Sequence, residues 1–240
     1  MSPFAEKTAL QNTCMTCGKK HLSLIDNLNY SELEILESHR TEIHYKKRET
    51  IYKEGTKPLG LLCLNAGKAK LVRTADNGKE QIVGLRKPVD FIDVRPLMTD
   101  SPHRNTAVAL ENSSVCIIDK NDFMQVVKNN SDLSMKLIRF FAEELDEADK
   151  RLVNMTQKHL RARLADALLQ LLDIYGTLPD NETVNCTLKR SDLAGLSNMT
   201  TANVIRTISS FNKEGIIENE KKRIKIKNPE ALKAISVDAS

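Results

Sequence analysis

Two short blocks of hydrophobic residues near the C-terminus recur at helical spacing, with polar residues between them. The first block consists of Leu193, Ala194 and Leu196, and the second of Val204, Ile208 and Phe211. Ser191 and Thr200 precede the blocks, and both are residue types that cap helix N-termini. The spacing predicts two short helices joined by a tight turn, which is a helix-turn-helix.

The second predicted helix exposes small and polar side chains once its hydrophobic residues point inward. The candidate DNA-contacting residues on or beside this face are Thr200, Thr201, Ala202, Asn203 and Arg206. An arginine donates two hydrogen bonds to the major-groove acceptors of guanine, so we expect Arg206 to read a base. We expect Asn203 and the threonine hydroxyls to contact bases or phosphates. The alternative is an ordinary pair of packed helices.

A strand pattern follows the two helices. Residues 216–219 and 224–227 flank a charged tip, which predicts a small β-hairpin, or wing. The expected phosphate-contacting residues at the tip are Lys221, Lys222 and Arg223. Residues 203–227 carry seven Lys or Arg against three Glu, so the local field is positive, as DNA binding requires. For Lys225 and Lys227, a merely solvated strand edge is an equally good interpretation.

A long helical pattern precedes the helix-turn-helix, from about residue 133 to residue 155. Its hydrophobic seam consists of Ile138, Phe141, Leu145, Ala148, Leu152 and Met155, spaced three and four residues apart. This spacing is typical of a coiled coil and predicts a dimerisation helix within residues 121–157. A dimer would present two reading helices to a palindrome. The alternative is a helix that packs along its own domain.

The first half of the chain contains short β-type runs separated by turn signals. The runs lie at residues 50–52, 60–64, 68–74, 81–85, 107–110 and 115–118, with a turn at Asp76-Asn77-Gly78. This spacing predicts a β-roll (a double-stranded β-helix or jelly roll) as a sensor domain over residues 22–120. The predicted fold is therefore α+β: the β-roll, the long dimerisation helix, and a winged helix-turn-helix over residues 158–240.

The composition of the chain predicts its cellular compartment and argues against some classes of function. The net charge is +4 and the pI is near 8.7, so basicity is local, unlike that of a histone-like or membrane-coating protein. Without a signal peptide or a membrane-spanning run, we expect a cytoplasmic protein. We expect no enzyme, because the sequence has no Ser/His/acid order, phosphate loop or HExxH motif. A ligand-binding or protein-interaction module that does not read DNA bases is the alternative function.

The order of β-roll, long helix and winged helix resembles the CRP/FNR family of bacterial transcription regulators, from about residue 20 to residue 235. The resemblance rests on residues 50–55 (TIYKEG) and 64–71 (LNAGKAKL) of the roll, and on residues 109–116 (ALENSSVC), which are similar to the FNR branch. It implies a homodimer on a palindromic promoter, with Arg206 at the guanine-contacting position. We also expect contact with RNA polymerase, and no membrane partner because the sequence has no membrane-spanning run. Ala202 stands where the family usually has a base-reading Glu, so we expect a different operator.

The resemblance also bears on the effector. Family members that bind cyclic AMP use a Gly-Glu pair for the ribose and an Arg followed by Ser or Thr for the cyclic phosphate. This chain has Ile92-Asp93-Val94-Arg95 at the first position, without Gly-Glu. An unpaired ligand group costs typically about 1 to 3 kcal/mol, so cyclic AMP is not expected. The candidate effector residues are Arg95, Arg104, Asn105 and Thr106. They suit an anionic ligand, and surface or ion-paired arginines are the alternative.

Cysteines provide candidate metal ligands. The FNR branch holds an oxygen-sensing iron-sulfur cluster on three N-terminal cysteines and one in the roll. Here Cys14 and Cys17, in an N-terminal arm over residues 1–21, match the first pair and Cys116 matches the distant ligand, but Ser23 occupies the third position. His21 is a candidate substitute for the missing thiol. Iron-sulfur, zinc, a dithiol switch and no metal stay open, so the sequence leaves the cofactor undetermined.

Overall fold

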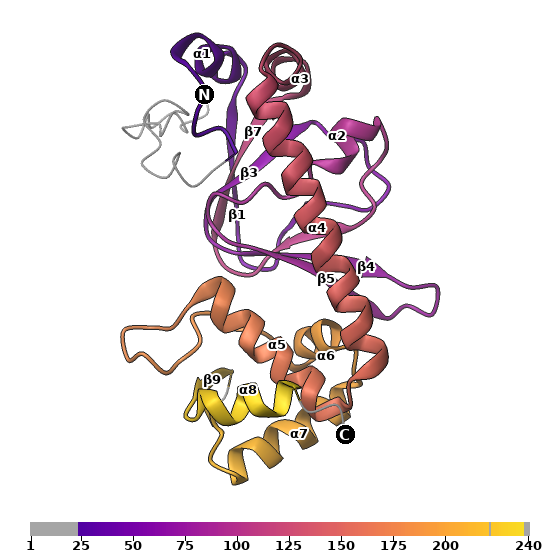
Figure 1. The fold of residues 1–240 in the computed structure, drawn as a ribbon, viewed down its shortest axis with the longest axis vertical. Coiled ribbons are helices and arrows are strands. Elements are labelled where there is room, and N and C mark those ends of the chain that lie inside the picture. Colours follow the sequence, from indigo (N-terminus) through magenta and orange to yellow (C-terminus); the bar gives the residue numbers. More distant parts are fainter. Residues whose placement is uncertain (1–23, 221, 238–240) are drawn as a thin grey trace, which may run out of the picture.

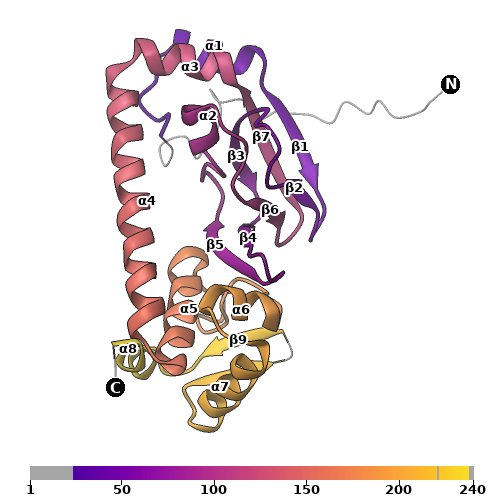
Figure 2. The same cartoon turned by 90° about the vertical axis from the view of Figure 1, so that its right-hand side faces the viewer.

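The computed structural model describes residues 24–220 and 222–237. A β-roll forms one end of the molecule and a helical domain with a small hairpin forms the other (Figure 1). The long helix α4 (Ser131–Gln157) runs along one side of both (Figure 2). This is the α+β order predicted from the sequence. Within the described residues, no helix is both long and apolar enough to cross a bilayer.

The roll consists of two antiparallel sheets with a shared interior. Its strands are β1 (Thr41–Tyr45), β2 (Thr50–Tyr52), β3 (Gly60–Ala66), β4 (Ala69–Thr74), β5 (Glu80–Arg86), β6 (Thr106–Ala109) and β7 (Ser113–Asp119). One sheet has the order β1-β7-β3 and the other β2-β6-β4-β5. Leu64 and Val115 of the first sheet and Leu71 and Ala107 of the second are buried in one cluster. Because side chains alternate along a strand, the other face of each sheet is left for other elements.

Helices cover the outer face of the first sheet. They are α1 (Tyr30–Ser38), α3 (Lys120–Asn129) and the beginning of α4, and α2 (Arg95–Thr99) contributes Leu97 to the same hydrophobic cluster. The helical region predicted over residues 121–157 consists of two helices. Asn130 ends α3, and its side-chain oxygen accepts a hydrogen bond from the Leu133 N–H at 2.8 Å as the N-cap of α4.

The C-terminal domain is a winged helix-turn-helix. Its elements are α5 (Leu160–Tyr175), α6 (Arg190–Ser197), α7 (Thr201–Lys213), β8 (Ile217–Glu220), β9 (Arg223–Ile226) and α8 (Pro229–Val237). Its hydrophobic core continues into the roll, since Val72, Ile82 and Leu85 belong to the same cluster as Leu168 and Leu193. The two domains therefore pack as one body.

Polar contacts reinforce this junction. The Lys70 ammonium lies 2.6 Å from the Asp192 carboxylate, and both side chains are almost fully buried. The Tyr175 hydroxyl reaches backbone carbonyls of the roll at 3.3–3.4 Å. A Cβ at Gly195 would lie 2.9 Å from the Glu80 carbonyl oxygen, so this close approach of α6 to β5 requires glycine.

Candidate DNA interface and effector region

The turn between α6 and α7 is fixed at both ends. Asn198 adopts the left-handed conformation (φ 50°, ψ 52°) that ends many helices, and its N–H donates to the Ala194 carbonyl. Thr200 caps α7 by accepting a hydrogen bond from the Asn203 N–H at 3.2 Å. Arg163 of α5 donates to the Asn198 carbonyl at 2.9 Å, which fastens the turn to the domain. The predicted helix-turn-helix and the predicted Thr200 cap are thus present.

The first helix begins differently from the prediction. Ser191 was the expected N-cap, but α6 begins at Arg190 and Lys189 takes the capping position. The Lys189 N–H donates to the Asp192 carboxylate at 3.0 Å, which satisfies an N-terminal donor and places an acid in the first turn. Asp192 is also the ion partner of Lys70. The cap prediction for Ser191 is therefore wrong, because the helix begins one residue before Ser191 and its first N–H is held by the Asp192 carboxylate instead.

Helix α7 buries one face and presents the other to solvent. Val204, Ile208 and Phe211 are at most 2% exposed, whereas Ile205 is 49% exposed. Of the predicted contact residues, Thr200, Thr201, Ala202 and Arg206 are exposed and Asn203 is half-buried. The Arg206 guanidinium donates a hydrogen bond to the Asn203 side-chain oxygen. The structure thus gathers these residues on one exposed face around a single, oriented arginine.

The far end of α7 is held by α5. Arg161 binds both carboxylate oxygens of Glu214 at 2.7 and 2.8 Å and packs over the Phe211 ring at 4.9 Å. The Ser210 hydroxyl also donates to Glu214, at 2.6 Å. These hydrogen bonds, with the guanidinium charge, lower the pKa of Glu214 to about 2. Sequence reasoning missed this clamp, because its partners are 53 residues apart.

The predicted wing is present beside α7. Strands β8 and β9 pair from Ile217 with Ile226 to Glu220 with Arg223. Lys222 and Arg223 are exposed at the tip, and Lys221 lies outside the described residues. The other two strand lysines are engaged in ion pairs, Lys225 with Glu220 and Lys227 with Glu182, both at 2.8 Å. Among the described residues of the hairpin, the positive charges without an ion pair, Lys222 and Arg223, therefore lie at the tip.

The roll has a cavity of about 230 Å³ beside α2. Its lining residues are Asp93, Arg95, Pro96, Thr99, Ser101 and Arg104. Two of the four predicted effector residues, Arg95 and Arg104, therefore meet at one cavity. The other two do not line it: Asn105 accepts a hydrogen bond from the Tyr52 hydroxyl at 2.6 Å, and Thr106 accepts one from the Glu54 N–H at 3.1 Å.

A buried group of aromatic and polar side chains lies next to this cavity. The His103 ring lies 3.0 Å from the Asp93 carboxylate, and both side chains are at most 4% exposed. The Tyr52 ring stacks on His103 with 3.7 Å between ring centroids. Burial raises the pKa of Tyr52 above its ordinary value, so its hydroxyl stays protonated and donates to Asn105. Sequence reasoning missed this group, because its members come from distant segments.

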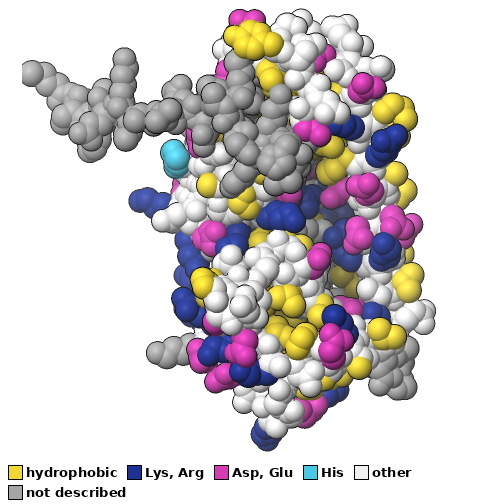
Figure 3. Space-filling model, turned by 60° about the vertical axis from the view of Figure 1, so that its left-hand side comes forward, with side chains coloured by type: hydrophobic (Ala, Val, Ile, Leu, Met, Phe, Trp, Pro, Cys, Tyr) yellow, Lys and Arg dark blue, Asp and Glu magenta, His cyan; other side chains and the backbone are white. Residues whose placement is uncertain are grey.

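The predicted dimer seam is largely exposed. Ile138, Leu145 and Leu152 lie seven residues apart on α4 and are 60%, 63% and 62% exposed. Phe141 and Met155 are half-buried, and Ala148 is exposed. In Figure 3, hydrophobic side chains appear among charged ones along the right-hand edge, where α4 lies. The monomer therefore leaves an apolar heptad row in solvent.

The β-roll and the winged helix-turn-helix each match a model of a known protein family. Residues 42–130 match the model of the cyclic nucleotide-binding domain, and residues 162–235 match that of the Crp-like helix-turn-helix domain. The transcriptional activator protein FnrL of Cereibacter sphaeroides is 25% identical, over 91% of this chain and 89% of the relative. The fumarate and nitrate reduction regulatory protein of Salmonella typhimurium is 24% identical, over 93% and 90%. The chain belongs to the CRP/FNR family of transcription regulators.

Solved structures show the same fold. The structure of FixK2 from Bradyrhizobium japonicum aligns with a TM-score of 0.71 at 22% identity, covering 84% of this chain and 99% of that one. The family is one of regulators that bind DNA and act as dimers, and its members are not enzymes. The predicted family, fold and function as a DNA-binding transcription regulator are therefore confirmed.

Little of the predicted metal site can be located in this CRP/FNR regulator. Cys14, Cys17 and His21 lie outside the described residues, and Cys116 is half-buried in β7. Within the described part of the chain, no three His, Cys, Asp or Glu side chains are grouped to hold a metal ion. Cys63 of β3, which is not among the predicted ligands, is the direct register partner of Cys116.

Proposed function

We propose that this CRP/FNR regulator binds a palindromic promoter site as a homodimer, with α4 as the dimer axis. The observation that supports this most strongly is the exposed heptad row of Ile138, Leu145 and Leu152. Fully burying an aliphatic side chain of this size contributes roughly 1.5–3 kcal/mol, so a second copy of the row would stabilise a dimer. Because α4 leads into the DNA-binding domain, the same axis would relate two reading helices.

In this proposal α7 enters the major groove. Arg206 would donate to a guanine, and Asn203, which already binds the guanidinium, would orient it and contact a neighbouring base. Thr200, Thr201 and the wing residues Lys221, Lys222 and Arg223 would contact phosphates or bases, with Ala202 allowing close approach. Ala202 stands where the family usually has a base-reading Glu, which supports an operator sequence that differs from the usual one of the family.

The effector proposed for the roll is a small anion. Arg95 and Arg104 supply two guanidinium groups to one cavity, and Thr99 and Ser101 add hydroxyl groups. The carboxylate there belongs to Asp93, which lies 3.0 Å from the His103 ring and 4.0 Å from the Arg95 guanidinium, so a bound anion would share Arg95 with it. We further propose that the dimer contacts RNA polymerase at the promoter and works in the bacterial cytoplasm, where the chromosome lies.

The test is binding to sites selected in vitro from random double-stranded DNA. We expect enrichment of an inverted repeat with half-site centres about one helical turn apart, bound by two protomers. In the Arg206→Ala variant the preference at one base pair of each half-site should weaken. Selection of no repeated motif, or equal losses on specific and random DNA, would contradict the assigned base reading.

A further inference from the structure

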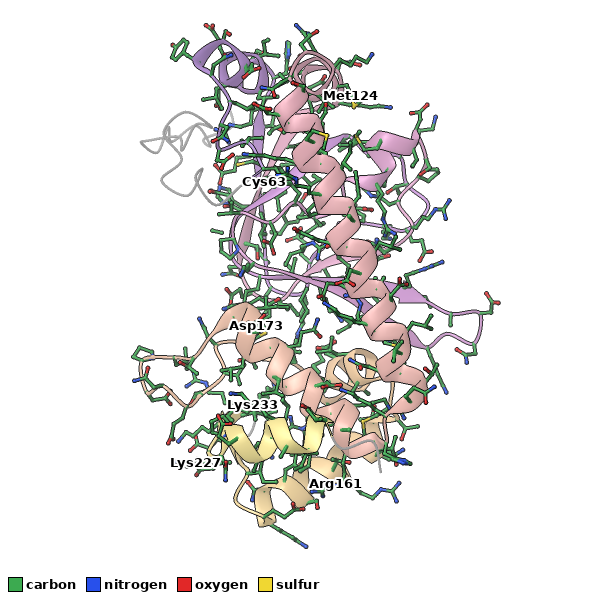
Figure 4. All side chains as sticks on the ribbon, viewed as in Figure 1. Cys63, Met124, Arg161, Asp173, Lys227 and Lys233 are labelled. Carbon is green, nitrogen blue, oxygen red and sulfur yellow. The ribbon has the colours of Figure 1, made fainter. Side chains whose placement is uncertain are left out.

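A second cavity, of about 190 Å³, lies where the roll meets the winged domain. It shares no lining residue with the cavity beside α2. The polar residues that line it are Lys47, Lys68 and Glu111 from the roll, and Asn185, Cys186 and Arg223 from the other domain. Figure 4 shows Asp173 at the end of α5 that lies next to the roll, close to this junction.

Turns of the roll form one wall of this junction cavity and are fixed against one another. The Lys47 N–H, between β1 and β2, donates to the Asn112 side-chain oxygen, between β6 and β7, at 3.0 Å. Gly67 lies in the turn that carries Lys68 and has a φ of 89°. A Cβ there would lie 2.2 Å from the Ser113 hydroxyl oxygen, so this turn packs directly on β7. The wall is therefore formed before any ligand binds.

Lys68 is the most buried cation of the junction cavity. Its side chain is only 11% exposed, and its ammonium lies 3.0 Å from the Glu111 carboxylate. The same ammonium donates to the Asn185 side-chain oxygen at 3.3 Å and lies 5.6 Å from the centre of the Tyr175 ring. These contacts hold the charge at a defined place between the two domains.

Two further cations, Lys47 and Arg223, line the same cavity and are exposed to solvent. With Lys68 they give three positive side chains against one carboxylate, that of Glu111. Burial raises the pKa of the Cys186 thiol to about 12, and the positive charges of Lys68 and Lys47 partly offset this effect. Both ammonium groups therefore act on the interior of the cavity, where the field is positive.

The size and charge of the cavity select the class of ligand. Cavities for drug-sized ligands measure about 300–1,000 Å³, so this one suits a smaller molecule. Lysine binds phosphate as a point charge, and arginine donates paired hydrogen bonds to it. Cations that approach from both domains can each bind a different oxygen of one phosphate group.

We propose that the junction cavity binds a small phosphate-bearing molecule, which then competes with DNA for Arg223. The competition rests on the proposed contact of Arg223 with a DNA phosphate. The Val184 N–H donates to the Ile224 carbonyl at 3.0 Å, so the loop that carries Asn185 is joined to the strand that carries Arg223. A phosphate held between the two lysines and Arg223 therefore ties the wing to the roll. By linkage, DNA and this ligand weaken each other's binding by the same factor.

The test follows the Cys186 amide by NMR in the full-length protein labelled with [15N]cysteine. The Cys186→Ser variant identifies this signal among those of the five cysteines. Inorganic phosphate, glycerol phosphate and acetate are titrated separately at constant ionic strength. Lys47→Ala removes one proposed contact at an exposed position. Lys46→Ala is the matched control, because Lys46 is exposed beside Lys47 but is not among the residues that line the cavity.

We expect both phosphates to shift the Cys186 signal to saturation in the wild type and in Lys46→Ala. In Lys47→Ala the affinity for phosphate should fall at least about tenfold, because a hydrogen bond between charged groups is lost. Unchanged affinity in Lys47→Ala would overturn the proposal. So would the absence of a saturable shift in the wild type, or an equal affinity for acetate.

DNA binding is measured in parallel at constant ionic strength, because salt alone weakens it. Phosphate should lower the affinity of the wild type for DNA about fivefold or more, and that of Arg223→Ala less. The same affinity of the wild type with and without phosphate would overturn the competition. The Cys186 titration needs no DNA, so failure of the phosphate site is distinguished from failure of the proposed promoter reading.

Discussion

Helices α7 and α4 are both amphipathic, but α7 buries its apolar face whereas α4 leaves much of its apolar face exposed. Helix α7 buries its apolar face within its own domain, where Val204 and Phe211 are fully covered, and exposes polar side chains. Helix α4 buries only its first turns, at Leu133 and Leu137, and then exposes Leu145 and Leu152. A polar face turned to solvent suits DNA, whereas an exposed apolar row requires a protein surface.

The largest expected effect comes from a charge placed in the apolar row of α4. Leu145→Glu would bury two unpaired carboxylates in a dimer interface, which costs several kcal/mol. We expect dimer dissociation to increase at least ~100-fold and affinity for palindromic DNA to fall with it, because every 1.4 kcal/mol is tenfold. Light scattering and fluorescence anisotropy measure the two quantities.

Val153→Glu is the matched control for this change. Val153 is 56% exposed on the same helix but adjacent to the row rather than in it. We expect this variant to dimerise and bind DNA like the wild type. A Leu145→Glu protein that remains a dimer, or loss of the dimer in Val153→Glu, would show that the heptad row is not the interface.

The next largest effect concerns the polar face of α7. Arg206→Ala should cost about 1–3 kcal/mol of binding free energy on the selected site and relax the preference at one base pair. Arg223→Ala, at the wing, should weaken binding to all sequences about equally and reduce the salt dependence, as loss of a phosphate contact does. Binding isotherms on matched and mismatched duplexes at several salt concentrations distinguish the two roles.

A smaller effect is expected at the beginning of α7. Thr200→Ala removes the hydroxyl that caps the Asn203 N–H and should lower the free energy of unfolding by ~1 kcal/mol. Thr201→Ala, at an exposed position inside the helix, should change the stability far less. Urea unfolding of both variants gives the comparison, and an equal loss in the two would contradict the capping role.

The smallest effect is a pH dependence at the other end of α7. The pKa of Glu214 is lowered from 4.5 to about 2, chiefly by its hydrogen bond with Arg161. Its ionised form therefore stabilises the fold above about pH 4.5, and this contribution is lost as the pH falls toward 2. Because Glu214 is 41% exposed, we expect less than ~1 kcal/mol. Glu214→Gln has no carboxylate at this position, so the wild type should be more stable than the variant above about pH 4.5. This difference in the free energy of unfolding should shrink as the pH falls toward 2.

Local pattern predicted the elements whose causes are local. The Thr200 cap, the apolar face of α7 and the alternating strand before Lys227 were all readable from spacing. The hairpin turn at Gly78 was also predicted, and its φ of 75° explains the glycine. These features depend on neighbours within a few residues, so sequence alone was sufficient.

The features that could not be predicted from the sequence depend on residues that are far apart in the chain. Lys70 and Asp192 are 122 positions apart, and their ion pair joins the domains, while the same carboxylate accepts a hydrogen bond from the Lys189 N–H at the start of α6. The stacking of Tyr52 on His103 and the pairing of Cys63 with Cys116 also require the roll to be closed. No periodicity encodes such contacts, because only the strand order brings the residues together.

Dimeric binding to a palindrome is tested most directly by the mass of the protein–DNA complex, measured by sedimentation velocity. The full palindrome selected in vitro is compared with a duplex that carries one half-site. We expect two protomers on the palindrome and much weaker binding to the half-site, because the exposed row of α4 would hold the two reading helices together. One protomer on the palindrome, with the same affinity as for a half-site, would contradict it.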